Sequence, residues 1–201
     1  GSDGIGDTPY YVGPNNQDNY PFIDPYSRQR IWTVDDDGPA DFQTIQEAIN
    51  HADEGDAIFV RNGRYFENLI VNKSVSLIGE KRNATIIDGN FTGNVIKITA
   101  SAVTISDFTI QRSNSTLPNC KGVYIGIGNT GIKVSSNVIK ENGYGVYLYS
   151  STGNTISGNT ISNNQIEGIE LASSPYTSIN ENNITNSGIG IMLYSASDYC
   201  N

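Results

Sequence analysis

Two short acidic segments near the start of the chain have the composition of a site for a hard cation. Asp3 and Asp7 are separated by glycine-containing sequence, and Asp35, Asp36 and Asp37 are consecutive. Ca²⁺ prefers carboxylate and carbonyl oxygens on a tightly turning backbone. We therefore expect Ca²⁺ first at Asp3 and Asp7 and second at the three consecutive aspartates, and a solvated acidic turn is the alternative at both places. One His and two Cys give little support to a transition-metal site.

Glu167 and Glu170 are the acids best spaced for cleaving a glycosidic bond. A glycosidase needs two carboxyl groups roughly 5–10 Å apart, and these two flank Gly168 and Ile169. Solvated surface acids are the commoner explanation of such a pair, so the expectation leans away from an enzyme and names no catalytic residue. The only histidine, His51, is expected on the surface.

A group of tyrosines is expected on one flank of the molecule. Flat aromatic faces can stack on sugar rings or bury against another subunit, and tyrosines that stand edge-on to shield a sheet are the alternative. The group comprises Tyr124, Tyr147, Tyr149 and Tyr194.

Asn-x-Ser/Thr sequons are the candidates for modification. Several sequons arise by chance in a chain rich in Asn, Ser and Thr, so they inform only together with other signs of export. The five candidates for glycosylation are Asn72, Asn83, Asn90, Asn114 and Asn183.

An internal repeat predicts the elements that position these residues. A motif of glycine, aliphatic, any residue, aliphatic begins at Gly122, Gly145, Gly168 and Gly190, at spacings of 23, 23 and 22 residues. A second motif runs in step, with asparagine at 137, 159 and 182. Each repeat holds about three short strands, which at ~3.3 Å per residue make one coil of a parallel β-helix rather than a hairpin pair. A β-sandwich with accidental asparagine periodicity is the alternative.

Alternation along each strand predicts which side chains fill the coils and which face outward. The three repeat asparagines are expected to form a turn ladder whose amides bond the coils above and below. A related motif 29 residues before the one at Val134–Ile139 makes residues about 113–121 an insertion. The outward column is expected to be Tyr124, Tyr147, Glu170 and Met192. The inward ladders are expected to be Val123/Val146/Ile169/Ile191, Ile125/Leu148/Leu171/Leu193 and Ile110/Ile139/Ile161/Ile184.

Composition agrees with an all-β protein and excludes several other classes. The chain of 201 residues has 26 Ile and 11 Val against 6 Leu and one Met, an excess of β-branched residues that favours strands. No window is apolar over the eighteen or more residues of a membrane span. The net charge of −9 and the absence of any Lys or Arg cluster exclude a protein that binds the nucleic-acid backbone.

The N-terminal part of the chain differs from the repeats. Apolar residues at 42, 45, 48, 49 and 52 form one helical stripe, which predicts a capping helix over about 41–52 with Asp41 as N-cap. Residues 1–30 are rich in Tyr, Pro and Asp and contain no repeat. We expect residues 1–30 to pack on their own or a neighbouring β-helix, and residues 31–201 to form the β-helix with its capping helix.

The two cysteines lie about three and a half coils apart. At ~4.8 Å per coil, Cys120 and Cys200 are separated by on the order of 15 Å, beyond the ~7 Å Cα limit of a disulfide. An intramolecular bridge would need the insertion to reach far along the stack. The alternatives are free thiols or a bridge from Cys200 to another subunit, which an oxidising exterior would allow.

Several of these segments resemble right-handed parallel β-helix proteins of the NosD-like, pectate-lyase-like superfamily. The resemblance rests on Ile31–Asp37, Phe42–Ile49, Gly55–Val60 and Ser76–Gly79, and continues through the coils at 122–201. It implies an archaeal or bacterial cell-surface protein. The segment Asp3–Tyr10 with Asn19–Pro21 also resembles that family, where it closes the C-terminal end of such a domain; here it stands first.

The displaced closing segment and the coil at Gly190–Asn201, for which no cap is visible, favour head-to-tail assembly. We therefore expect an extracellular, non-catalytic structural subunit that binds copies of itself in a fibre or surface layer, glycosylated and stabilised by Ca²⁺. The alternative is a polysaccharide-binding or polysaccharide-lyase-like module of a surface protein. A third interpretation, an accessory protein for metal-centre maturation, rests on the family name alone.

Overall fold

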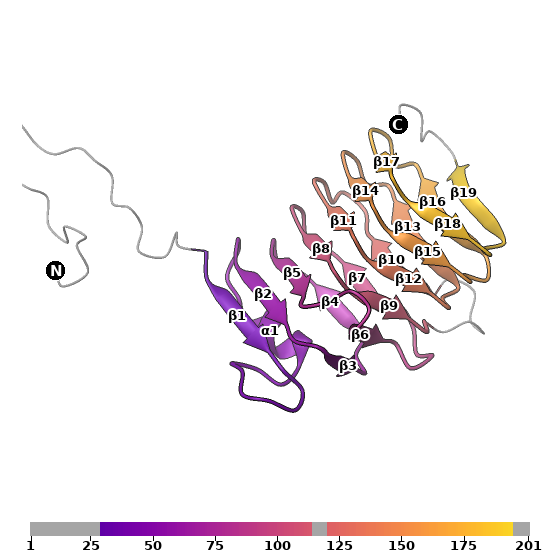
Figure 1. Cartoon of the computed structure of the whole chain (residues 1–201). Helices are drawn as coiled ribbons and strands as arrows, with labels where there is room; N and C mark the ends of the chain where they lie inside the picture. The colour runs from indigo at the N-terminus through magenta and orange to yellow at the C-terminus, as the bar shows by residue number, and fades with distance from the viewer. Residues whose placement is uncertain (1–28, 114–119, 195–201) are drawn as a thin grey trace, which may run out of the picture.

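The computed structural model describes residues 29–113 and 120–194 (Figure 1). The predicted segment 1–30 therefore lies almost wholly outside the described residues. Within those ranges the chain forms nineteen strands and one short helix, and every strand pair is parallel. The expectation of an all-β parallel β-helix is confirmed.

The strands form three parallel sheets, and from β2 onward each coil contributes one strand to each sheet in turn (Figure 1). Sheet 1 contains β1 (Ile31–Val34), β2 (Ala57–Val60), β5 (Ser76–Gly79), β8 (Thr104–Ser106), β11 (Lys133–Ser135), β14 (Thr155–Ser157) and β17 (Ser178–Asn180). Sheet 2 contains β3 (Gly63–Tyr65), β6 (Thr85–Asp88), β9 (Thr109–Gln111), β12 (Val138–Lys140), β15 (Thr160–Ser162) and β18 (Asn183–Thr185). Sheet 3 contains β4 (Leu69–Val71), β7 (Ile96–Ile98), β10 (Lys121–Ile125), β13 (Tyr144–Tyr149), β16 (Glu167–Ala172) and β19 (Ile189–Tyr194).

The observed strand register matches the repeat spacing. Val123 pairs with Val146, which pairs with Ile169, which pairs with Ile191. The offset of 29 residues is also confirmed, since Val134 pairs with Ile105 in sheet 1. The extra residues of that coil fall between β9 and β10, where residues 114–119 lie outside the described part.

The inward side chains fill the coils with β-branched and other aliphatic groups. In each sheet the residues that alternate inward, such as Val146, Leu148 and Ile161, are fully buried, and Phe108 is the largest fully buried side chain. A coil stack buries one side of every strand, so the isoleucine-rich composition follows directly from the architecture. The same inward positions are exposed in the last described coil, where Leu193 is 54% exposed.

Asparagine ladders tie the coils together at the corners. The predicted ladder of Asn137, Asn159 and Asn182 is confirmed: the Oδ1 of Asn159 accepts the backbone N–H of Asn137 at 2.9 Å, and the Oδ1 of Asn182 accepts that of Asn159 at 3.0 Å. A second ladder at the corner between sheets 2 and 3 was not predicted, although its members, Asn142 and Asn164, are also 22 residues apart. Buried backbone groups at both corners thereby receive partners.

Glycine is needed where each coil begins its strand in sheet 3. A Cβ added to Gly145 would lie 2.4 Å from the carbonyl oxygen of Gly168, and one added to Gly168 would lie 2.6 Å from that of Gly190. The glycine that leads each repeat is therefore explained by close approach of the next coil's backbone.

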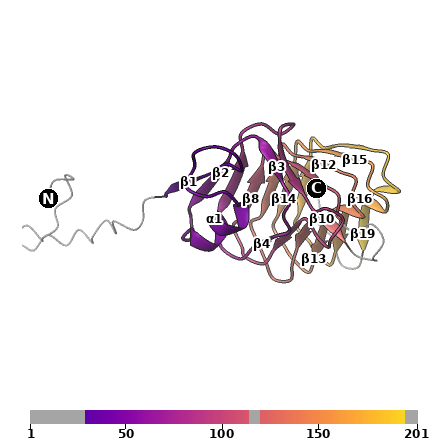
Figure 2. The same cartoon turned by 90° about the horizontal axis from the view of Figure 1, so that it is seen from below.

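The helix α1 (Ile45–His51) covers the start of the stack beside β1 and β2 (Figures 1 and 2). Its buried residues are Ile45, Ala48 and Ile49. The prediction that Asp41 is the N-cap of this helix is wrong. The Oγ1 of Thr44 accepts the N–H of Glu47 and caps the helix, whereas Asp41 accepts hydrogen bonds from Thr33. The sequence pattern extended the helix too far because Asp41 and Thr44 are both acceptable N-caps.

The second coil anchors both ends of this helix. The carboxylate of Glu67 accepts the backbone N–H groups of Ile45 at 2.8 Å and Gln46 at 2.9 Å, and the Nζ of Lys73 donates to the carbonyl oxygen of Ala52 at 2.6 Å. These contacts satisfy helix-end groups that would otherwise lack partners. Across the described residues, no helix is both long and apolar enough for a transmembrane segment.

Candidate functional site

The outer face of sheet 3 gathers aromatic and charged side chains from β10, β13 and β16. The predicted outward column is confirmed by the register, which pairs Tyr124 with Tyr147, Tyr147 with Glu170, and Glu170 with Met192. A neighbouring column holds Lys121, Tyr144 and Glu167, the residues directly before the repeat glycines. We define the sheet 3 outer face by Lys121, Tyr124, Tyr144, Tyr147, Tyr149, Glu167 and Glu170.

The tyrosine rings on this face contact one another. The ring centroids of Tyr124 and Tyr147 are 6.0 Å apart at an interplanar angle of 23°, and those of Tyr147 and Tyr149 are 6.5 Å apart at 22°. Tyr144 meets Tyr147 edge-on at 5.5 Å. Three of the four predicted tyrosines, Tyr124, Tyr147 and Tyr149, therefore lie in one group. Ala172 lies between Tyr149 and Tyr194 in the strand register of sheet 3.

Sequence reasoning missed Tyr144 and Lys121, although their position before the repeat glycine was a usable signal. The Nζ of Lys121 lies 4.5 Å from the ring centroid of Tyr147, 5.2 Å from that of Tyr144 and 5.8 Å from that of Tyr124. The lysine is only 6% exposed, and this burial lowers its pKa. The rings thus hold a buried ammonium group by cation–π contacts.

The two glutamates of β16 have different surroundings. Glu167 is 7% exposed, and its Oε2 has no hydrogen-bond partner within the described ranges. Burial raises the pKa of Glu167, and the nearby charge of Glu170 raises it further. Burial also raises the pKa of Glu170, opposed by the positive charge of Lys121. Only Glu170 of the expected acid pair is partly accessible to a ligand on the surface.

The face therefore combines rings, phenol groups and one accessible carboxylate around a buried cation. Phenol and carboxylate oxygens can exchange hydrogen bonds with hydroxyl groups. Exposed parts of aromatic rings favour the apolar faces of flat ligands. Burial raises the pKa of Tyr147, with the charge of Glu170 acting in the same direction, so its phenol stays a neutral donor.

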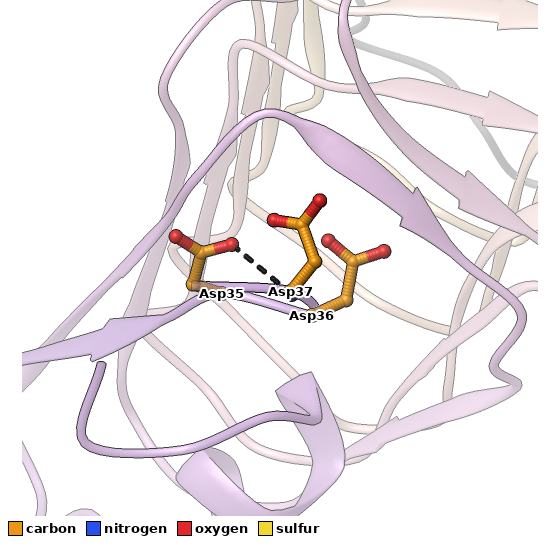
Figure 3. Close-up of side chains that lie close together, drawn as sticks. All are labelled: Asp35, Asp36 and Asp37. Carbon is orange, nitrogen blue, oxygen red and sulfur yellow. Dashed lines mark hydrogen bonds between the residues drawn. The ribbon is translucent and has the colours of Figure 1, made fainter. Parts of the chain in front are cut away.

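The three consecutive aspartates lie in the turn that follows β1 (Figure 3). One carboxylate oxygen from each lies within 4.8 Å of the others, and the backbone N–H of Asp37 donates to the Oδ1 of Asp35 at 3.4 Å. The group is mostly exposed, and such acidic turns are common without an ion. Ca²⁺ at this turn stays a prediction, and Asp3 and Asp7 lie outside the described residues.

The remaining predicted sites are spread over the surface or undescribed. Asn72, Asn83, Asn90 and Asn183 are all exposed, as glycosylation requires, and Asn114 lies outside the described residues. Cys120 has a free thiol that is buried before β10. The expected pairing through Cys200 lies outside the described residues, so an intermolecular bridge also stays a prediction.

The family model described as "Periplasmic copper-binding protein (NosD)" matches residues 49–200. No curated protein matches the chain.

The solved structures that match include carbohydrate-active enzymes. Carrot pectin methylesterase is 19% identical with a TM-score of 0.63, covering 87% of this chain and 53% of its own. A mutant pectin methylesterase in complex with a hexasaccharide is 19% identical, with a TM-score of 0.59, 83% of this chain covered and 67% of its own. The catalytic domain of a GH87 alpha-1,3-glucanase in complex with tetrasaccharides is 18% identical, with a TM-score of 0.69; the match covers 85% of this chain and 32% of the glucanase chain. This chain thus spans about half of the carrot enzyme and a third of the glucanase domain, and the likeness shows the fold.

The residues of the described part do not fit a copper site. Copper favours imidazole, thiolate and thioether ligands. The described residues offer only His51 in α1, Cys120 directly before β10 and Met192 in β19. His51 packs against the rings of Trp32 and Phe42, at 4.6 and 5.2 Å. Among residues 29–113 and 120–194 the one cluster of three metal-binding side chains is the aspartate group, whose oxygens suit hard cations.

Proposed function

The chain belongs to the NosD family, and on that premise we propose that it is a carbohydrate-binding β-helix that acts outside the cytoplasm. The sheet 3 outer face is the binding surface, and its ligand is a neutral, hydroxyl-rich sugar chain. The observation that carries this proposal is the contiguous group of Tyr124, Tyr144 and Tyr147 around Lys121, with Glu170 beside it.

The charges of the face favour a neutral sugar over an acidic one. Lys121 is buried beneath the rings, so its charge is not presented to a ligand, whereas Glu170 is partly accessible and would repel a carboxylate. Phenol and carboxylate groups remain to bond sugar hydroxyls, and the edges and free faces of the rings pack on C–H groups.

Two further observations support this proposal. The structural neighbours include a pectin methylesterase with a bound hexasaccharide and a glucanase with bound tetrasaccharides, so the shared fold is able to present a surface to sugar chains. The family description places its namesake in the periplasm, which agrees with a role outside the cytoplasm. The proposal includes no cleavage step, because the Oε2 of Glu167 is shielded from a ligand on the surface.

Replacing Tyr147 tests this face directly. Isothermal titration of the wild type with an α-1,3-linked gluco-oligosaccharide and with a fully methyl-esterified oligogalacturonide is expected to show binding to at least one of them. Tyr147→Ala removes the central ring and is expected to weaken that binding about tenfold, equivalent to ~1.4 kcal/mol. Tyr147→Phe keeps the ring over Lys121 and is expected to keep most of the affinity.

Tyr176 provides the matched control for this substitution. It is an exposed tyrosine in the turn after β16, outside the sheet 3 outer face. Tyr176→Ala should bind like the wild type. Equal affinity of Tyr147→Ala and wild type, or no binding of either sugar by the wild type, would contradict the proposal.

End-to-end assembly is a second candidate function, favoured by the exposed apolar side chains of β19. Ile191 and Leu193 occupy inward positions that are fully buried in the earlier coils, and here they are exposed, as is the neighbouring Ile189. A second copy or a further coil placed on this end would bury them. Sedimentation velocity over a concentration series should then show growing species, and a single monomer at every concentration would contradict this candidate.

A further inference from the structure

A second cluster of charged side chains, which shares no residue with the sheet 3 outer face, comes from the sheet 2 strands β3 and β6 and from the residue after β9. Arg64 belongs to β3, Asp88 ends β6, and Arg112 directly follows β9. The Nη2 of Arg64 lies 2.6 Å from the Oδ2 of Asp88, and the Nη2 of Arg112 lies 2.7 Å from the same oxygen. Because the two guanidinium groups share one oxygen, they are close neighbours.

Asp88 is saturated by these contacts and serves to hold the arginines together. Its side chain is fully buried, and it also accepts the Nε2 of Gln111 at 2.8 Å and the backbone N–H of Asn90 at 3.0 Å. The three ionised side chains together carry a net charge of +1 in a chain whose net charge is −9. A local excess of positive charge is thus built into an acidic protein.

Both guanidinium groups retain unused donors. Each arginine bonds Asp88 through Nε and Nη2 only, so neither Nη1 has a partner within residues 29–113 and 120–194. The arginine side chains are 43% and 23% exposed for Arg64 and Arg112. An arginine fork held in place by one carboxylate can offer its remaining N–H groups to a second oxyanion.

Two exposed phenylalanines flank these arginines. The guanidinium of Arg64 lies 5.2 Å from the ring centroid of Phe66, and that of Arg112 lies 5.1 Å from that of Phe91. The phenylalanines are 59% and 51% exposed. Phe91 has a φ of 60°, a conformation that is rare for a bulky residue, so its backbone is strained where the ring meets Arg112.

We propose that this cluster binds a hexuronate residue of an acidic polysaccharide. The carboxylate accepts N–H groups from the Nη1 atoms of Arg64 and Arg112, while the C–H face of the pyranose ring packs on Phe66 or Phe91. No covalent bond changes. The ligand differs from that of the sheet 3 outer face, and the inference stands whether or not that face binds a neutral sugar.

Titration calorimetry with trigalacturonate and with its methyl ester tests the proposal, because the ester removes only the charge. In the Tyr147→Ala background, which weakens binding at the sheet 3 outer face, we expect trigalacturonate to bind at least about tenfold more tightly than the ester. Arg112→Gln is expected to weaken trigalacturonate binding about tenfold or more. The double variant Phe66→Ala/Phe91→Ala leaves the ion pairs with Asp88 intact and is expected to weaken it about tenfold, which keeps the test decisive if Arg112→Gln does not fold.

Arg61→Gln is the matched control for the charge change. Arg61 also lies over a phenylalanine ring, that of Phe59 at 5.3 Å, but its ion-pair partner is Glu80 at 3.7 Å, whereas Asp88 pairs with Arg64 and Arg112. Replacement of Arg61 should change affinity less than about twofold. The variant Tyr147→Ala should also bind trigalacturonate normally, which separates failure of this inference from failure of the sheet 3 proposal.

Several results would overturn the inference. These are no binding of trigalacturonate, equal binding of the acid and its ester in the Tyr147→Ala background, or an effect of Arg61→Gln as large as that of Arg112→Gln. Competition with inorganic phosphate adds one more test of the sugar contact. If phosphate displaces trigalacturonate at the same concentration as monomeric galacturonate does, the phenylalanine rings contribute nothing and a hexuronate is the wrong ligand class.

Discussion

Replacing Asp88 with alanine is expected to lower the free energy of unfolding by about 3–5 kcal/mol. The change leaves the guanidinium groups of Arg64 and Arg112 side by side without their shared counter-charge. It also removes the acceptor for the Gln111 side chain and the Asn90 N–H. Urea denaturation followed by circular dichroism measures the loss.

Glu80→Ala provides the comparison, because Glu80 pairs with the half-exposed Arg61 at 3.7 Å. A surface pair of this kind contributes about 0–1 kcal/mol. A loss below about 1 kcal/mol for Asp88→Ala, or equal losses for the two variants, would show that the buried cluster does not hold the first coils together.

The same carboxylate should make stability depend on pH in acid. Burial opposes the ionisation of Asp88, but hydrogen bonds from Arg112, Gln111 and the Asn90 N–H outweigh it and lower the pKa to about 2. Because the folded pKa lies below the unfolded one, the stabilisation is complete above about pH 4 and is lost as pH falls toward 2. The loss is about 2 kcal/mol. Asp88→Asn should flatten this part of the stability curve, and an unchanged slope would contradict the assignment.

Asn159→Ala is expected to cost about 3–5 kcal/mol of unfolding free energy. Asn159 sits in the middle of the corner ladder, where its Oδ1 accepts the N–H of Asn137 and its Nδ2 donates to the carbonyl oxygen of Val134, both at 2.9 Å. Its Nδ2 also donates to the Oδ1 of Asn182 at 2.9 Å. Alanine leaves these buried groups without partners, and each costs about 1–3 kcal/mol.

Asn180→Ala is the matched control for the ladder. Asn180 is exposed at the end of β17, and its Nδ2 donates to the Ser178 hydroxyl at 3.0 Å. This variant should lose less than about 1 kcal/mol when unfolded in urea under identical conditions. If Asn159→Ala unfolds at the same urea concentration as Asn180→Ala, the ladder does not carry the coil contacts.

The architecture was predictable because successive coils place the same residue types at the same positions. The spacing of Gly122, Gly145 and Gly168 marks the positions where the next coil's backbone approaches too closely for a Cβ. The asparagines at 137 and 159 mark the corner where amide groups replace lost backbone partners. Each of these residue types is needed at its position for one physical reason. The repeat period therefore predicted both the coil and the side chains that point into it.

The sites were less predictable because they depend on contacts between particular coils. The burial of Lys121 under Tyr147 follows from its register with Tyr144, which only the stacked structure gives. The meeting of Arg64 and Arg112 on Asp88 joins three coils whose sequences show no shared motif. Asp41 was wrongly assigned as the N-cap, since its carboxylate accepts hydrogen bonds from Thr33 of β1, a contact that the helical pattern of the sequence does not show.

The central claim is that the sheet 3 outer face holds a sugar chain, and a nuclear magnetic resonance titration tests it most directly. The α-1,3-linked gluco-oligosaccharide or the methyl-esterified oligogalacturonide is added to isotope-labelled protein, and amide shifts are followed residue by residue. We predict the largest shifts at Tyr124, Tyr147 and Glu170, with little change in sheets 1 and 2. Shifts confined to other sheets, or none at saturating sugar, would contradict the claim.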